Sequence, residues 1–105
     1  MDRAFATQTP FNADFQELIT RFAWNEIWNR PGLGHRERRM IVISQTAALG
    51  RWEEFRLHAS AQAGTGVTDA EIDELLFQIA AYCGAPAGVA ARRNLKQARA
   101  ERDSA

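Results

Sequence analysis

Apolar residues recur at every third or fourth position through most of this chain, and glycine and proline interrupt the pattern. This spacing marks one face of an α-helix, and no segment shows the alternation of apolar and polar residues that is typical of a strand. The clearest helix begins at a capping box formed by Thr68 and Glu71. Its apolar face comprises Ile72, Leu75, Leu76, Ile79, Ala80 and Cys83. We therefore expect an all-α fold.

The interruptions divide the chain into about five helices joined by short connections. We expect the first helix to follow a cap at Asn12 or Asp14 and to end at about Asn29, and the fourth to follow the Thr68 cap and continue to Cys83. The other three are expected over residues 35–49, 51–63 and 86–99. Gly50 is expected to end the second helix in a left-handed conformation, and Pro86 suits the first turn of the fifth. We assign residues 1–11 to an N-terminal extension, residues 12–99 to a single domain and residues 100–105 to a C-terminal tail that frays.

Size and composition exclude several classes of protein. A chain of 105 residues buries a modest core, so association into an oligomer would stabilise it. Its 13 basic residues balance its 13 acidic ones, so we expect no nucleic-acid partner. We find neither an apolar run that spans a membrane nor a signal peptide. The single cysteine, Cys83, fits a reducing compartment, so we expect a cytoplasmic protein with Cys83 inert in its core.

An acidic residue interrupts the apolar face of the first helix. Glu26 follows Phe22 by four positions and Ala23 by three, within a face formed by Phe15, Leu18, Ile19, Phe22, Ala23 and Ile27. We expect such a carboxylate to be partly desolvated, which would raise its pKa. Arg30 follows four positions later, in the favourable order for an ion pair on one helix. Glu26 is therefore either half of a structural ion pair or a proton donor in a pocket between helices.

His58 is the second candidate for acid–base chemistry. It is expected to share a helix face with Glu54, Phe55 and Gln62. Glu54 lies one turn before it and would orient the ring or raise its pKa. Imidazole titrates near neutral pH and is the commonest general acid or base, although a lone histidine on a helix is more often structural.

Three arginines, Arg36, Arg38 and Arg39, stand at the start of the second helix. The positive end of a helix dipole disfavours arginine, so this placement indicates that the side chains bind an anion or an acidic neighbour. A solvated face explains each single arginine equally well. Arg36 and Arg39 are expected to point in similar directions and Arg38 in another.

Aromatic residues accompany these charges. Trp24 and Trp28 lie beside the apolar face of the first helix, and they would line a pocket or form a subunit contact. We find no glycine-rich phosphate loop, no Cys-x-x-Cys pair and no zinc-ligand spacing. His35 and His58 are the only histidines, so we expect no metal site and no cofactor.

Several blocks of this sequence together resemble the carboxymuconolactone decarboxylase and AhpD-like family. They are FAWNEIWNRPGL at residues 22–33, AALGR at 47–51, RLH at 56–58, GVT at 66–68 and YCGAPA at 82–87. The order and spacing of the blocks are specific, whereas each block alone would be weak. The resemblance covers nearly all of the chain from residue 11 to about residue 99.

The resemblance implies an all-helical AhpD-like fold assembled as a homo-oligomer, a hexamer or a trimer. It implies conversion of 4-carboxymuconolactone to 3-oxoadipate enol-lactone and carbon dioxide, without a cofactor, in protocatechuate degradation by the β-ketoadipate pathway. Counted back from His58, the redox cysteines of the peroxidase branch would fall at Arg51 and Glu54, so disulfide chemistry is not expected. Arg39 stands where the family often has glutamate, and Asn25 where its decarboxylases usually have glycine. The peroxidase proton-relay carboxylate is therefore missing at Arg39. Asn25 and the chain before the match, which is shorter than usual in the family, bear on substrate specificity.

Our mechanistic hypothesis gives His58 the role of acid, with Glu26 as its partner or proton relay. Arg30 and one or more of Arg36, Arg38 and Arg39 would clamp the substrate carboxylate and the oxyanion, because guanidinium binds such groups bidentately. An apolar wall that includes Trp24 would desolvate the leaving carboxylate. Two alternatives stay open: an AhpD-like enzyme acting on a different small carboxylate or lactone, and a non-catalytic oligomeric binding protein.

Overall fold

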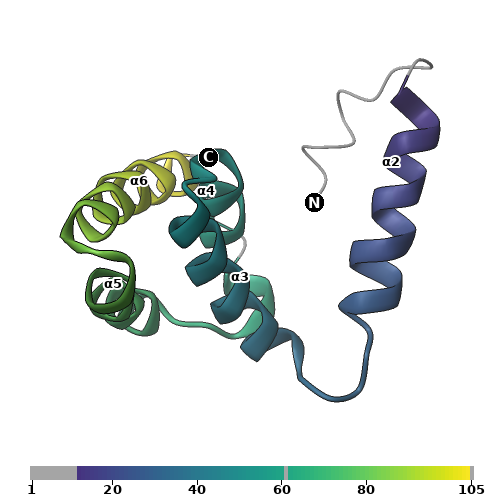
Figure 1. Ribbon diagram of the computed structural model, residues 1–105, viewed down its shortest axis with the longest axis horizontal. Coiled ribbons are helices and arrows are strands. Elements are labelled where there is room, and N and C mark those ends of the chain that lie inside the picture. Colours follow the sequence, from purple (N-terminus) through teal and green to yellow (C-terminus); the bar gives the residue numbers. More distant parts are fainter. Residues whose placement is uncertain (1–11, 61, 105) are drawn as a thin grey trace. The chain divides into compact units, whose positions relative to one another are not determined.

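The computed structural model describes residues 12–60 and 62–104 (Figure 1). Every regular element in this part of the chain is a helix, which confirms the all-α prediction. The predicted N-terminal extension, residues 1–11, lies outside the described residues, as does the side chain of Gln62. No described helix combines the length and the apolarity needed to cross a bilayer.

The chain forms two compact units, and His35 is the last residue of the first. The first unit contains the α-helix α2 (Ala13–Ile19) and the π-helical segment η2 (Thr20–Ile27). α3 (His35–Leu49) belongs to the second unit except for its first residue, His35. The other helices of the second unit are α4 (Trp52–Ser60), the 3₁₀ turn η3 (Gln62–Thr65), α5 (Asp69–Cys83) and α6 (Ala85–Asp103). The bounds of α3 and α5 match the predicted ranges, whereas α4 is shorter than predicted.

The first helix differs from the regular helix predicted to end at about Asn29. The backbone N–H of Trp28 donates to the carbonyl of Ala23 at 3.0 Å, a bond across five residues that is typical of a π-helix. The Thr20 hydroxyl donates to the Gln16 carbonyl at 2.9 Å, a side-chain bond that often accompanies local bending. The wider repeat changes which residues share a face.

The apolar face predicted to enter the core is exposed within the chain. Neither α2 nor η2 contains a buried residue, and Phe15 and Phe22 are 61% and 55% exposed. A single helix cannot cover its own apolar face. Nothing among the described residues of the first unit covers this face, so its packing into a core stays a prediction.

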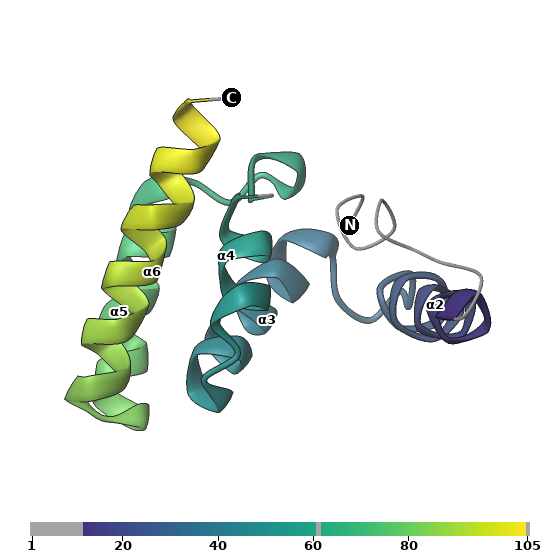
Figure 2. The same cartoon turned by 90° about the horizontal axis from the view of Figure 1, so that it is seen from above.

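The core lies in the second unit, where α6 contacts both α4 and α5 (Figures 1 and 2). The core residues come from all four α-helices and one loop: Ile43, Ala47, Phe55, Ala59, Val67, Ile72, Ile79, Ala91, Leu95 and Ala98. Trp52 packs against this core and meets Phe55 edge to face, with 5.4 Å between the ring centroids. Burial of these apolar side chains is the main favourable contribution to folding of this unit.

Gly50 ends α3 in a left-handed conformation, as predicted, with φ of 70°. Its N–H donates to the Ala47 carbonyl at 3.2 Å, and the Arg51 N–H donates to the Thr46 carbonyl at 2.8 Å. These two bonds form a Schellman motif, in which a positive φ favours glycine. The motif turns the chain directly into α4, the helix that carries His58.

The predicted capping box at the start of α5 is present. The Glu71 N–H donates to the Thr68 hydroxyl at 3.1 Å, and the Thr68 N–H donates to the Glu71 carboxylate at 3.0 Å. Cys83, by contrast, is exposed rather than part of the core. It is the last residue of α5, where the chain turns at Gly84 into α6.

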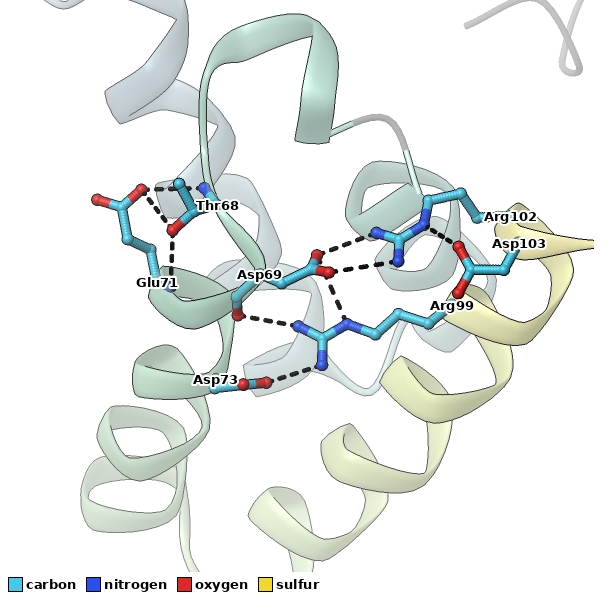
Figure 3. Close-up of polar contacts among 7 residues, drawn as sticks. All are labelled: Thr68, Asp69, Glu71, Asp73, Arg99, Arg102 and Asp103. Atoms are coloured by element: carbon cyan, nitrogen blue, oxygen red, sulfur yellow. Dashed lines mark hydrogen bonds and ion pairs between the residues drawn. The ribbon is translucent and has the colours of Figure 1, made fainter.

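Ionic contacts join the start of α5 to the end of α6 (Figure 3). The Arg102 guanidinium donates to both oxygens of Asp69, at 3.0 and 3.3 Å, and Arg99 donates to Asp73 at 2.8 Å. The carboxylates of Asp103 and Asp69 raise the pKa of Arg102. With Arg102 held in this way, α6 continues to Asp103 instead of fraying after Arg99 as predicted.

The hairpin of α5 and α6 depends on a close approach at Gly88. A Cβ added to Gly88 would lie 2.7 Å from the Cβ of Ala80. We expect Gly88→Ala to lower the free energy of unfolding by about 1–2 kcal/mol, because overpacking outweighs the helix preference of alanine. Urea denaturation measures this change. Gly32→Ala is the control, since a Cβ there meets nothing within 4 Å. Equal stability of the two variants would contradict the prediction.

Candidate functional site: a buried histidine paired with arginine

His58 lies on α4, with Phe55 one turn before it and Ala59 beside it in the core. Its side chain is buried, with 8% of the residue exposed. The same periodicity that places Phe55 inward also places His58 inward. The ring is therefore held by a packed helix face rather than by a loop.

Arg39, on α3, supplies a hydrogen-bond partner for this ring. Its Nη1 hydrogen-bonds to Nδ1 of His58, and Arg39 is itself only 8% exposed. The two residues are 19 positions apart and come from different helices of the second unit. This pairing was not predicted, because we assigned Arg39 to substrate binding.

The environment keeps the imidazole uncharged. Burial, together with the positive charge of Arg39, lowers the pKa of His58 from 6.5 to about 4. Burial also lowers the pKa of Arg39. Our prediction that Glu54 raises the pKa of His58 is wrong, because the Glu54 side chain is exposed and the ring faces a guanidinium instead.

Arg36, one turn before Arg39 on α3, forms an ion pair with Glu71 on α5. A second carboxylate, that of Glu37, lies 3.8 Å from its Nη1. Of the two explanations that we offered for these arginines, an acidic neighbour therefore applies to Arg36. Arg38 is half-buried on α3. Glu71 contributes to two contacts at once, since its other carboxylate oxygen completes the capping box of α5.

Glu26 and Arg30 are exposed in the first unit. The ion pair predicted between them is not formed, because η2 ends at Ile27 and Arg30 lies beyond the helix. The backbone N–H of Arg30 donates to the Ile27 carbonyl at 3.1 Å, which places Arg30 in a turn. The predicted desolvation of Glu26 is also not found in this chain. Its carboxylate is in contact with solvent and therefore open to proton exchange.

The aromatic residues of the first unit stack on one another. The rings of Trp24 and Trp28 are stacked, with centroids 5.1 Å apart. His35 meets Trp28 edge to face at 5.7 Å. Trp24 and Trp28 are half-buried, so part of each ring is accessible as apolar surface. Glu26 lies between them in the sequence.

The structure thus brings together His58, Arg39 and Arg36 around α3, α4 and α5 of the second unit. Trp24, Glu26 and Arg30 belong to the first unit. The predicted meeting of Glu26 with His58 stays a prediction. Nothing in the sequence spacing alone indicated the Arg39–His58 contact, since it joins two helices.

Sequence reasoning also missed a buried polar link between α4 and α6. Asn94 is 6% exposed, accepts a hydrogen bond from Arg56 Nη1 at 2.6 Å and donates to the Ala90 carbonyl at 2.8 Å. A polar residue between the core positions Ala91 and Leu95 was the available indication. This link fixes α6 against the helix that carries His58, because a buried amide that loses its partners is costly.

A groove of about 930 Å³ runs along α5 and α6. Apolar side chains including Leu76, Phe77 and Val89 line it, with Arg92 and Lys96 among the charged residues. None of the predicted site residues lines this groove. Among residues 12–60 and 62–104, no group of three or more His, Cys, Asp or Glu side chains is placed to hold a metal ion.

The lowered pKa of His58 predicts a pH-dependent stability. The unfolded chain binds a proton at this residue more readily than the folded one, so stability is full above about pH 6.5 and is lost as the pH falls toward 4. We expect the free energy of unfolding to fall by roughly 2 kcal/mol from pH 7 to pH 5 because the unfolded chain takes up a proton at His58. Urea denaturation of His58→Gln at both pH values should show a smaller difference. His35→Gln, at an exposed histidine, should keep it; identical pH dependence in all three proteins would rule the effect out.

Comparisons with known proteins identify relatives of this chain. The model of the carboxymuconolactone decarboxylase family matches residues 13–97. A 4-carboxymuconolactone decarboxylase of Acinetobacter baylyi is 43% identical over 91 residues, which cover 87% of this chain and 68% of that protein. A nitrosuccinic acid decarboxylase of Metarhizium robertsii is 36% identical over 91 residues, covering 87% of this chain and 64% of that protein. No solved structure matches the chain. The chain belongs to the carboxymuconolactone decarboxylase family.

Proposed function

We propose that this protein decarboxylates 4-carboxymuconolactone to 3-oxoadipate enol-lactone, as a carboxy-lyase of protocatechuate degradation by the β-ketoadipate pathway. The observation that carries the proposal is the 43% identity to a protein of that name across 87% of this chain. The buried His58–Arg39 pair supports it, because a polar pair held in a packed helical core is suited to act on a small anion.

The reaction sets three requirements for the site. The carboxylate that is lost is vinylogous to the lactone carbonyl, so departure of carbon dioxide leaves a dienolate whose charge extends to the lactone oxygen. The protein must hold the carboxylate, stabilise the developing oxyanion and allow a proton to reach carbon. The lactone itself accepts the electron pair, so the chemistry that we propose requires no cofactor.

His58 is the residue that we assign to the oxyanion. With a pKa of about 4 it is uncharged at neutral pH, so it is a poor source of a full proton and a better hydrogen-bond donor. This assignment replaces the role of general acid that the sequence favoured. Glu26, which is exposed to solvent, is then our candidate for relaying a proton from water to carbon.

Arginines provide the anion-binding groups in this proposal. Arg30 and Arg38 are our candidates to hold the substrate carboxylate, since guanidinium binds carboxylates bidentately. Arg36 pairs with Glu71 and Arg39 with His58, and we assign these two arginines to support the site through those contacts. Trp24, stacked on Trp28, would form an apolar wall beside the substrate.

The nitrosuccinic acid decarboxylase supports a related function, decarboxylation of a different substrate. Its name specifies decarboxylation of nitrosuccinic acid, a dicarboxylate whose nitro group stabilises a neighbouring carbanion. Both named reactions remove carbon dioxide and leave an anion that a hydrogen-bond donor would stabilise. Decarboxylation of a small carboxylate is therefore the broader form of our proposal. Asn25 and Arg39 are positions where this choice of substrate would be made.

We further propose that the protein is a cytoplasmic homo-oligomer, a hexamer or a trimer. The exposed apolar side chains of α2 and η2 support association, because contiguous apolar surface of this kind is usually covered by another protein surface. In the non-catalytic alternative, the same surfaces would serve assembly alone.

Carbon dioxide release from 4-carboxymuconolactone tests the proposal directly. We expect turnover by the native protein and a fall in kcat of about 10²–10³-fold in His58→Ala, because one oxyanion donor is lost. Glu26→Gln should lower kcat as well, by about 10²-fold or more, if Glu26 delivers the proton. His35→Ala is the matched control at an exposed histidine and should keep normal kcat. Near-normal kcat in both His58→Ala and Glu26→Gln would remove these residue assignments.

Nitrosuccinate serves as the second substrate in the same assay. Turnover of nitrosuccinate alone would favour the broader form of the proposal over the lactone. Release of carbon dioxide from neither acid would favour the non-catalytic reading. A rise in melting temperature with small carboxylates would then show that the protein binds them, because a ligand that binds only the folded state stabilises it.

A further inference from the structure

The contact between Arg39 and His58 specifies which ring nitrogen carries the hydrogen. A guanidinium has five N–H donors and no acceptor, so an atom that hydrogen-bonds to it must accept. Arg39 Nη1 bonds to His58 Nδ1, and Nδ1 therefore holds its lone pair toward Arg39. In an uncharged imidazole the single N–H must then be at Nε2.

The alternative tautomer is disfavoured by the position of the pair. Both residues are only 8% exposed, so water cannot readily replace a lost hydrogen bond. A hydrogen on Nδ1 would place an N–H against the N–H of a buried cation. Protonation of both nitrogens would produce the same clash and add a second positive charge beside the first. The low pKa of His58 is consistent with this geometry.

Packed helices hold both partners, so the contact is not a chance meeting of mobile side chains. Arg39 lies one turn before the fully buried Ile43 on α3, and His58 lies one turn after the fully buried Phe55 on α4. The Schellman motif at Gly50 joins these two helices directly. Residues whose helices are fixed in this way can hold a functional ring in one orientation.

We propose that Arg39 is a positioning residue that holds His58 as its uncharged, Nε2-protonated tautomer, so that His58 donates a hydrogen bond to the anion formed when the substrate loses carbon dioxide. The role toward substrate rests on the function proposed above, whereas the tautomer assignment does not. An imidazole with its lone pair on Nε2 would repel that anion. An uncharged imidazole N–H is known to act as an electrophile in enzymes.

The side chain at position 39 then determines whether Nε2 of His58 donates or accepts a hydrogen bond. A carboxylate at this position would accept a hydrogen bond from Nδ1 and leave the Nε2 lone pair available. Arg39→Glu should therefore exchange a donor for an acceptor at Nε2. Arg39→Lys keeps a side chain that can only donate, and should retain the native tautomer.

Nitrogen-15 NMR of histidine-labelled protein at pH 7 tests the tautomer without any substrate. Protonated and unprotonated ring nitrogens have distinct chemical shifts, and couplings to the ring protons separate Nδ1 from Nε2. We expect a protonated Nε2 and an unprotonated Nδ1 for His58 in the native protein and in Arg39→Lys. In Arg39→Glu we expect a protonated Nδ1. The native spectrum alone already tests the assignment, whether or not the variants fold.

Kinetics test the role toward substrate. Arg39→Glu should lower kcat by about 10²-fold with a smaller change in KM, because a hydrogen bond to the transition state is lost. Arg39→Lys should recover most of that loss. Arg92→Glu, at an exposed position on α6, makes the same change of charge and should leave both kcat and the His58 spectrum as in the native protein.

The outcomes separate this inference from the proposed function. A protonated Nδ1 in the native protein, or an unchanged His58 spectrum in Arg39→Glu, would overturn the tautomer assignment. A switched spectrum with unchanged kcat would overturn the role toward substrate. A native protein with the expected tautomer but no decarboxylation would uphold the positioning by Arg39 and overturn the proposed function instead.

Discussion

The second unit depends on the packing of α6 against both α4 and α5. Ala91, Leu95 and Ala98 supply the apolar face of α6, and Gly88 allows α5 to approach closely. The small residues Gly88, Ala91 and Ala98 let the helix axes approach, so that the apolar side chains between them exclude water. Asn94 lies within the same face and ties α6 to α4 through Arg56. This packed core positions the helices that carry His58, Arg39 and Arg36.

A buried histidine beside a buried arginine is an unusual use of such a core. Burial disfavours the charged form of both side chains, and repulsion between two buried cations is avoided because the imidazole stays uncharged. A carboxylate beside His58 would instead have accepted a hydrogen bond from Nδ1 and left the Nε2 lone pair available. The sign of the charge next to the ring thus determines whether His58 is better suited to proton transfer or to hydrogen-bond donation.

The first unit poses the opposite physical problem, because its apolar side chains are exposed within the chain. Phe15, Leu18 and Phe22 are each about half exposed or more, on a helix that changes from α to π geometry at Thr20. Burying such a surface is favourable, so an additional protein surface would stabilise this segment. The proposed homo-oligomer is one arrangement that would supply it.

The sequence by itself determined the all-α class, the bounds of α3 and α5, the left-handed Gly50 and the capping box at Thr68, since these depend on residues near one another in the chain. It also indicated the family through short blocks in a fixed order. Only the tertiary structure decided that His58 faces Arg39 rather than Glu54, and that Cys83 is exposed. Helical periodicity says which face a residue occupies but not which side chain of another helix it meets, and that partner sets the charge on the ring.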